Sequence, residues 1–330
     1  MNTTEGAAPL GADANRLANM PVSFFAMVMG MSGLTIAWEK MEVTQFVPFA
    51  ASHMLAHATL GLFVVLLAFY AAKFVLHRDA VMKELRHPVR LSFFPAISIS
   101  MLLLSIVLMG LYPGLAKGFW IVGAALHLAL TIYVLSSWIH HTHYDIKHMS
   151  PAWFIPVVGN VVVPVAGVPL GFVEPSWFFF SLGLVFWIVL KAIVLYRIIF
   201  HHPMPDKLAP TLFIFIAPPA VAFLAYLKLT GGELDAFARV LYYTGLFLTI
   251  LLLAQFPRFA QLKFFLSWWA YSFPLAAISI ATFVMAEKTG LAWFETTGHI
   301  LFAILNVVLA LLVVRTIDQV LKKAICVEEA

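Results

Sequence analysis

Ten apolar stretches run along the sequence, each about long enough to cross a lipid bilayer, and no other feature limits the fold so strongly. A transmembrane helix needs about 20 mostly apolar residues, because an α-helix rises about 1.5 Å per residue through roughly 30 Å of hydrocarbon. Hydrophobic residues make up 62% of the 330 residues and charged residues 11%, which excludes a water-soluble domain of this size. The sequence therefore predicts an all-α integral membrane protein. The stretches are 22–38, 50–76, 92–112, 115–140, 154–172, 175–199, 209–229, 235–255, 264–286 and 295–321.

The ten stretches form one predicted transmembrane domain, residues 21–321, between short tails at 1–20 and 322–330. An even number of crossings places both tails on the same side of the membrane. Lys and Arg are retained on the cytoplasmic side of a bilayer, and 15 of the 20 Lys and Arg fall on the side of the tails. Both termini are therefore predicted to be cytoplasmic, in a cell (inner) membrane, and the net charge of +4 requires no nucleic-acid partner. The Lys and Arg on the other side are Lys40, Lys117, Lys228, Arg239 and Lys288.

Within the apolar stretches, proline is almost confined to the odd-numbered ones. Four prolines recur in the similar contexts FFPA, FIPV, IAPP and SFPL, spaced 61, 62 and 56 residues apart: Pro95, Pro156, Pro218 and Pro274. A proline inside a helix removes one backbone hydrogen bond, and in lipid the freed group needs protein or water as a partner. The pattern predicts five helical hairpins, in which kinked inner helices surround a wet central pore and outer helices face lipid. The alternative is that these prolines are only packing kinks, which transmembrane helices often contain.

The odd-numbered stretches carry small polar side chains and no charged residue in their central parts. Cation pathways and proton-coupled carriers usually show intramembrane acids, so a pore lined by hydroxyls and an amide would be permissive to anions. Lys191 is the one charge well inside a stretch, and its ammonium would either reach the cytoplasmic interface or attract anions at an inner mouth. The predicted pore-lining polar residues are Asn160, Ser98, Ser272, Ser279 and Thr282.

The histidines suggest a rival hypothesis, a metal-dependent membrane enzyme. Imidazole is a common ligand for iron and zinc, and histidines cluster at 53–57, 140–148 and 201–202. The first cluster begins the second stretch on the outer side, whereas the other two lie on the cytoplasmic side, about 30 Å away. One metal centre cannot use both sides. The sequence therefore predicts no metal site, no cofactor and no enzymatic activity.

Four segments resemble a known family. KFFLSWWAYSFPLAAISIATFVMAE (263–287), HPVRLSFFPA (87–96), VVGN (157–160) and FIAPPA (215–220) resemble the plant guard-cell slow anion channels and the bacterial tellurite-resistance/dicarboxylate transporter family. The resemblance runs over nearly the whole ten-span region. It implies five hairpins with quasi-fivefold symmetry around a pore, usually in a homotrimer.

The resemblance also implies a gate. A pore-occluding phenylalanine of the family corresponds to Phe273, next to Pro274, and a second phenylalanine corresponds to Phe94. The expected function is an anion-selective channel for small inorganic anions such as chloride or nitrate, closed by the Phe273 ring. The alternative is a secondary transporter or exporter of dicarboxylates or of oxyanions such as tellurite.

Overall fold

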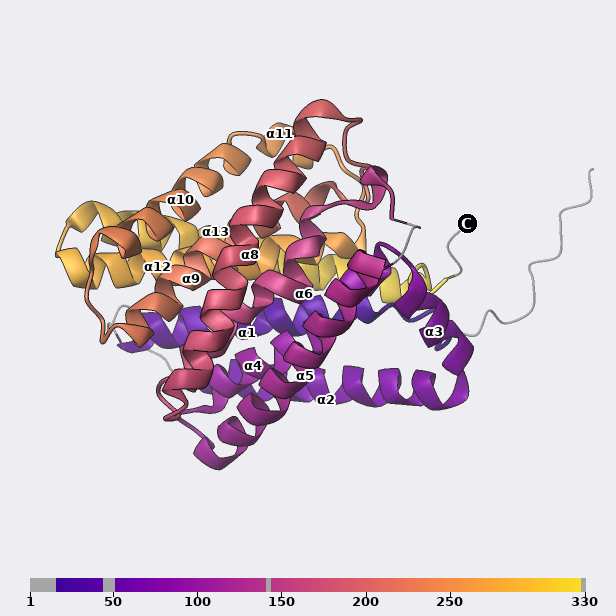
Figure 1. The fold of residues 1–330 in the computed structure, drawn as a ribbon, viewed down its shortest axis with the longest axis horizontal. Coiled ribbons are helices and arrows are strands. Elements are labelled where there is room, and N and C mark those ends of the chain that lie inside the picture. Colours follow the sequence, from indigo (N-terminus) through magenta and orange to yellow (C-terminus); the bar gives the residue numbers. More distant parts are fainter. Residues whose placement is uncertain (1–15, 44–50, 141–143, 328–330) are drawn as a thin grey trace, which may run out of the picture.

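The computed structural model of the chain describes residues 16–43, 51–140 and 144–327, and the regular structure in these ranges is entirely helical (Figure 1). The elements, with η for a 3₁₀-helix, are η1 (Val22–Phe24), α1 (Phe25–Val43), α2 (Ala51–Leu76), α3 (Arg78–Arg86), η2 (Arg90–Phe93), α4 (Ala96–Leu108), α5 (Pro113–His140), η3 (Ile146–His148), η4 (Pro151–Trp153), α6 (Phe154–Val158), η5 (Gly159–Val162), α7 (Val163–Gly167), α8 (Val173–Phe200), η6 (Ala209–Phe215), α9 (Ala217–Leu229), α10 (Ala236–Leu253), α11 (Phe256–Phe259), η7 (Leu266–Tyr271), α12 (Ser272–Thr289) and α13 (Ala292–Leu321).

Nine helical spans among the described residues are long and apolar enough to cross a membrane, so the chain is a multi-pass membrane protein, as predicted. They match nine of the ten predicted stretches. The predicted fifth span, 154–172, differs, because it is divided into α6, η5 and α7. Pro156 and Pro164 lie in this run, and each removes a backbone donor, so the segment alternates between α and 3₁₀ geometry instead of forming one continuous helix.

The four recurrent prolines lie where a 3₁₀ segment gives way to an α-helix. Pro95 caps α4 after η2, and Pro156 lies in the first turn of α6 after η4. Pro218 and Pro274 lie in the first turns of α9 and α12, which follow η6 and η7. The first turn of a helix leaves its N–H groups without intrahelical partners, so a missing donor costs little there. The predicted kinks are therefore changes of helix type near one end of each segment.

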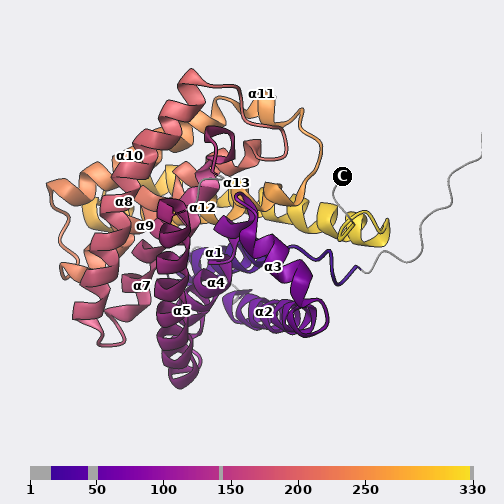
Figure 2. The same cartoon turned by 45° about the vertical axis from the view of Figure 1, so that its right-hand side comes forward.

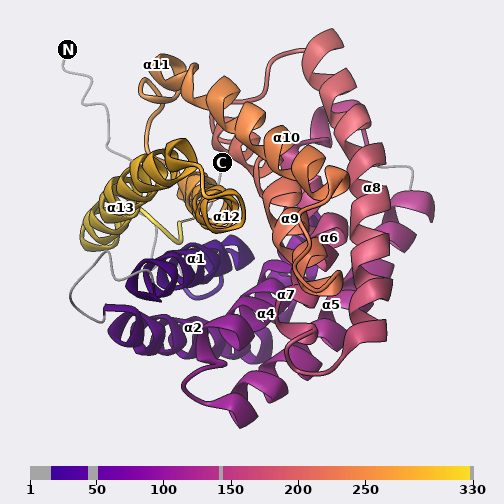
Figure 3. The same cartoon turned by 90° about the vertical axis from the view of Figure 1, so that its left-hand side faces the viewer.

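Helix contacts divide the bundle into two layers. The inner segments are α1, α4, the run α6–η5–α7, α9 and α12; the outer helices are α2, α5, α8, α10 and α13. The inner segments touch in a closed ring, since α4 contacts α1 and α7, α9 contacts α7 and α12, and α12 contacts α1. Each outer helix packs on the inner segment that precedes it in the chain and also on the neighbouring inner segment of the ring. For example, α2 packs on α1 and on α4, and α13 packs on α12 and on α1. Figure 3 shows α2, α8, α10 and α13 outside α1, α9 and α12.

Burial separates the same two layers. In four inner spans 67–78% of the most apolar window is buried within the protein, whereas in the five outer helices the share is only 28–33%. The exposed surface of the outer helices is rich in large apolar side chains, such as Phe69, Val185, Phe247 and Val314. Since lipid is an apolar solvent, this outer layer suits contact with hydrocarbon.

The two ends of the described chain lie at one end of the bundle. Arg16 Nη2 donates a hydrogen bond to the carbonyl oxygen of Lys323, 3.4 Å away. The end of α13 and the short helix α3 lie at this end too, as Figures 1 and 2 both show. Residues 1–15 and 328–330 of the predicted tails, and His141 and His143 of the histidine cluster, lie outside the described residues.

A buried ion pair fastens α3 to the bundle. Lys73 Nζ of α2 lies 2.8 Å from Glu84 Oε2 of α3, and the two side chains are only 3% and 4% exposed. The other oxygen of Glu84 accepts a hydrogen bond from the backbone N–H of Val22, and Tyr70 OH donates to Oε2. Lys73 also donates to the carbonyl of Met20. The carboxylate thus joins α2, α3 and the start of the first inner segment.

Candidate functional site

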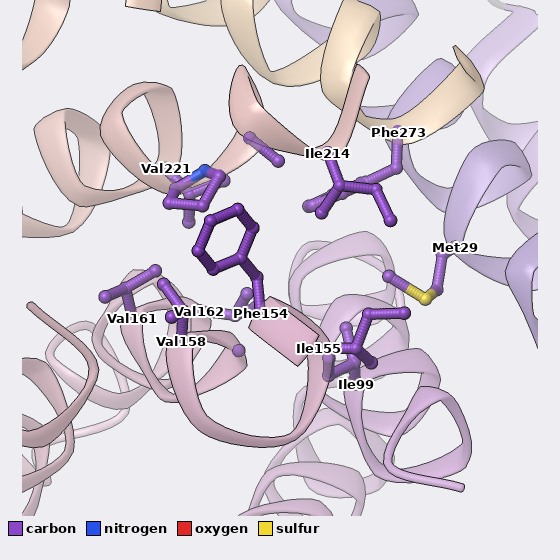
Figure 4. Close-up of a pocket in the computed structure, with 13 residues that line it drawn as sticks. Met29, Ile99, Phe154, Ile155, Val158, Val161, Val162, Ile214, Val221 and Phe273 are labelled. Atoms are coloured by element: carbon purple, nitrogen blue, oxygen red, sulfur yellow. The ribbon is translucent and has the colours of Figure 1, made fainter. Parts of the chain in front are cut away.

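Two small cavities lie within the ring of inner segments. The first, which we call the deep cavity, measures about 50 Å³ and is lined from all five inner segments (Figure 4). The second, which we call the entrance cavity, measures about 60 Å³ and is lined largely by the 3₁₀ segments at the end that carries the chain termini. No charged residue lines either cavity. The deep cavity is lined by Met29, Ile99, Phe154, Ile155, Val158, Gly159, Val161, Val162, Ile214, Ala217, Pro218, Val221 and Phe273.

The two cavities meet at a group of large apolar side chains. Met29, Ile155, Ile214 and Phe273 line both cavities, as does the small residue Ala217. We call the four large residues the collar. Figure 4 shows Phe273 and Ile214 on one side of the deep cavity and Ile155 on the other, with Met29 between them. Because the collar side chains border both spaces, they form the barrier between them.

Phe273 is held from behind by close packing of α1 on α12. A Cβ atom on Gly33 would lie 2.7 Å from Cβ of Ala276 and 3.4 Å from Cδ2 of Phe273. Only a residue without a side chain allows the two helices to approach this closely. The ring itself is half-buried, whereas Ser272 and Pro274 beside it are buried. The packing therefore fixes the backbone of Phe273 and leaves its ring at the cavities.

The second predicted gate residue, Phe94, points away from the cavities. It is buried, and its ring lies edge-on to Tyr70 of the outer helix α2, with 6.2 Å between the ring centroids. The adjacent Phe93 lines the entrance cavity. Successive residues of a helix point about 100° apart. A difference of one residue therefore places Phe93 at the cavity and Phe94 in the packing against α2.

The predicted polar pore residues do not line either cavity. Ser98 lies 2.9 Å from Nδ1 of His127 on α5, and Asn160 donates to Thr131 Oγ1, also on α5. These contacts place both side chains between an inner segment and an outer helix.

The remaining polar residues are buried as well, and none lines a cavity. Thr282 accepts a hydrogen bond from Tyr242 of α10, and Ser272 donates to the carbonyl of Trp269, whereas the Ser279 hydroxyl has no hydrogen-bond partner among the described residues. For the paired residues the difference from the prediction has a physical reason, since an intramembrane hydroxyl or amide is stabilised by a helix carbonyl or another side chain.

Of the kink prolines, Pro218 lines the deep cavity and Pro274 the entrance cavity. Pro95 and Pro156 line neither. Lys191 lies on the outer helix α8, where its ammonium sits over the ring of Trp187, 4.5 Å from the centroid, in a cation–π contact. This contact holds the ammonium against the outer layer rather than at a pore mouth.

Sequence reasoning missed three members of the collar, Met29, Ile155 and Ile214. A signal was present for Ile155, because it directly precedes a recurrent proline, as Ala217 and Phe273 do. All three border both cavities, so the position before the proline faces the junction in three of the four motifs. Met29 and Ile214 carry no comparable mark in the sequence.

Comparison with known proteins assigns the sequence to a family. A family model described as "SLAC1: Voltage-dependent anion channel" matches residues 19–317. The chain belongs to this family. The resemblance found in the sequence is therefore confirmed, and this SLAC1-family chain is a member of an anion channel family and not of an enzyme family.

Curated relatives of the SLAC1-family chain include plant and bacterial proteins. The S-type anion channel SLAH2 of Arabidopsis thaliana is 31% identical over 284 residues, which cover 84% of this chain and 54% of SLAH2. The guard cell S-type anion channel SLAC1 of the same species is 27% identical, over 82% of this chain and 50% of its own length. The tellurite resistance protein TehA homolog of Haemophilus influenzae is 25% identical over 92% of both chains. The chain thus spans about half the length of these plant relatives.

Proposed function

We propose that the chain is an anion-selective channel for small monovalent anions such as chloride or nitrate, closed by Phe273 together with the rest of the collar. The observation that supports this most directly is the meeting of two uncharged cavities at four large apolar side chains inside the ring. An apolar constriction of this kind blocks ions by size and by excluding water. Because no carboxylate lines the path, nothing there repels an anion once the collar opens.

The proposal includes the arrangement around the collar. The run α6–η5–α7 completes a tenth crossing, so that five hairpins surround the pore with quasi-fivefold symmetry. The chain ends are cytoplasmic, because the Lys and Arg excess is on their side of the bundle. The protein lies in the cell (inner) membrane as a homotrimer, the assembly that the family resemblance implies.

A secondary transporter of dicarboxylates or oxyanions is the second candidate. Two separate cavities on either side of one constriction also suit a carrier that opens to each side in turn. A relative in Haemophilus influenzae is named for tellurite resistance, and one in Methanocaldococcus jannaschii is named an uncharacterized transporter.

Recording from the purified protein in a planar bilayer separates the two candidates. A channel gives resolvable unitary currents whose reversal potential follows the chloride gradient and shifts when nitrate replaces chloride. A carrier gives uptake that saturates and shows counterflow, without unitary steps. Unitary anion currents are the expected result, and saturable counterflow alone would overturn the channel proposal.

We expect membrane voltage to affect gating only weakly, although the family description includes voltage dependence. Moving one charge through the full field is worth about 2.3 kcal/mol per 100 mV, and the collar and the cavity linings carry no charge to move. The conductance–voltage curve of the purified protein should therefore be shallow, equivalent to about one gating charge or fewer. A steep curve that requires several gating charges would contradict this account of the collar.

A further inference from the structure

Three hydroxyl side chains line the entrance cavity, each from a different 3₁₀ segment. They are Ser23 of η1, Thr211 of η6 and Ser267 of η7. Among the described residues that line this cavity, no other has a hydroxyl, amide or charged side chain. An ion that enters from the end with the chain termini would therefore meet these hydroxyls as its main polar side-chain partners.

The three hydroxyls occupy one position of the internal repeat. Ser267 and Thr211 begin the segments SWWAYSFP and TLFIFIAP, seven residues before the recurrent prolines. Ser23 begins SFFAMVMG, which matches SWWAYSFP without a gap and has glycine in place of the proline. The other two repeats have Pro88 and Met149 at this position. A hydroxyl thus occupies the same place in three of the five inner segments.

This repeat position lies on the face that leads to the collar. Residues three apart lie on one face of a 3₁₀-helix and are neighbours on an α-helix. From Ser267 the next two residues at this spacing are Ala270, which also lines the entrance cavity, and Phe273 of the collar. Six residues of helix span roughly 9–12 Å. The hydroxyls therefore precede the collar by about two turns, on the side of the chain termini.

The hydroxyl of Ser267 is available to a ligand. Its oxygen is buried and has no hydrogen-bond partner among the described residues. A buried hydroxyl without a partner is uncommon in proteins, and one that borders a cavity points to a water molecule or ligand there. Thr211 differs, because its hydroxyl donates to the carbonyl oxygen of Leu208, 2.6 Å away. Ser23 and Ser267 can therefore donate to an anion, whereas the Thr211 oxygen can accept from water that the anion retains.

The backbone favours negative charge in the same cavity. First-turn residues of four long inner helices, α1, α4, α9 and α12, line it: Ala26, Ala96, Ala217 and Phe273. The N-terminal end of an α-helix carries roughly half a positive charge, and four such ends meet at this cavity. No acidic residue lines it. A small anion is therefore favoured over a cation at the three hydroxyls.

We propose that Ser23, Thr211 and Ser267 form a binding site for a partly hydrated monovalent anion at the entrance to the collar. The inference rests on the proposed channel function and extends it, because it assigns anion selectivity to side chains outside the collar. Ser23 and Ser267 replace part of the hydration shell before the anion reaches the apolar collar. Chloride holds its water more tightly than nitrate does, so chloride depends more on these donors.

Two serine replacements in an open channel test the site. In a Phe273→Ala background, Ser23→Ala together with Ser267→Ala should raise the chloride concentration for half-maximal conductance about tenfold, because two donors to the anion are lost. The nitrate-to-chloride permeability ratio, measured from reversal potentials, should rise as well. An unchanged half-maximal concentration and an unchanged permeability ratio would overturn the proposal.

Ser279→Ala in the same background is the matched control. Its hydroxyl is also buried without a partner among the described residues, but it lines neither cavity. Both measured quantities should stay at the values of the Phe273→Ala channel. If the double serine variant does not fold, Ser267→Ala alone replaces it, with a smaller rise in the same direction.

A second measurement does not depend on conduction. Chloride should raise the unfolding midpoint of the purified wild-type protein in a saturable way, compared with gluconate at the same ionic strength. Gluconate is too large for a cavity of about 60 Å³. If no variant conducts, the channel proposal fails, whereas chloride stabilisation that is lost with the two serines would still support the anion site. No stabilisation of the wild type by chloride would overturn the site.

Discussion

Phe273→Ala should fold normally and conduct anions on the order of tenfold more than the wild type or better, because losing the ring removes at least about 1.4 kcal/mol from the barrier at the collar. Phe273 borders two existing cavities, so truncation joins them and leaves the surrounding packing largely in place. A Phe→Ala change in a sealed core costs about 3–5 kcal/mol of stability, and this variant should lose less. Single-channel recording and thermal unfolding of the purified variant check both parts.

Three further variants test whether Phe273 is the main barrier in the collar. Phe273→Leu and Ile214→Ala each remove only part of the collar, so both should conduct between the wild type and Phe273→Ala. Phe94→Ala is the matched control, since that ring packs on Tyr70 away from both cavities. It should lower thermal stability without raising the current. A well-folded Phe273→Ala protein with wild-type currents would show that Phe273 is a packing residue.

Glu84→Ala should lower the free energy of unfolding by about 3–5 kcal/mol, because it leaves the ammonium of Lys73 buried without its carboxylate. The backbone N–H of Val22 and the hydroxyl of Tyr70 lose their acceptor as well. A lower unfolding midpoint, with loss of the α3 packing, is the expected result in denaturation of the detergent-solubilised protein.

An exposed ion pair at the same end of the bundle provides the control. Lys147 Nζ lies 3.0 Å from Asp145 Oδ2, and these side chains are 71% and 61% exposed. Exposed pairs contribute about 0–1 kcal/mol, so Lys147→Ala, which removes this pair and leaves the Asp145 carboxylate to cap η3, should unfold close to the wild-type midpoint. Equal midpoints for Glu84→Ala and Lys147→Ala would contradict the role given to the buried carboxylate.

The layers of the fold could be predicted because proline position follows the helix type. Lipid-facing helices must satisfy all their backbone groups within the helix, whereas inner segments can change type where neighbouring protein surrounds them. That difference placed Pro95, Pro156, Pro218 and Pro274 on inner segments. It could not show that 154–172 is broken into three short pieces, since this depends on how two prolines combine with the tight packing of Gly159 and Gly167.

The site was harder to predict than the fold. Phe273 was placed through family resemblance, and the structure puts it at the junction of the cavities. Ser98 and Thr282 were chosen for their polarity, but polar side chains on these helices pair with outer helices, leaving apolar residues to line the deep cavity.

The closure of the ring between α1 and α12 also determines the order in which the barrier is assembled. During synthesis Met29, Ile155 and Ile214 are made before Phe273. Gly33 of α1 therefore has no α12 to pack against until the ninth stretch has been made. A nascent chain with eight stretches inserted therefore has a gap in the ring at the position of α12 and Phe273. Translation that stops before residue 273 would leave a partial ring without the Phe273 side chain at the junction of the two cavities.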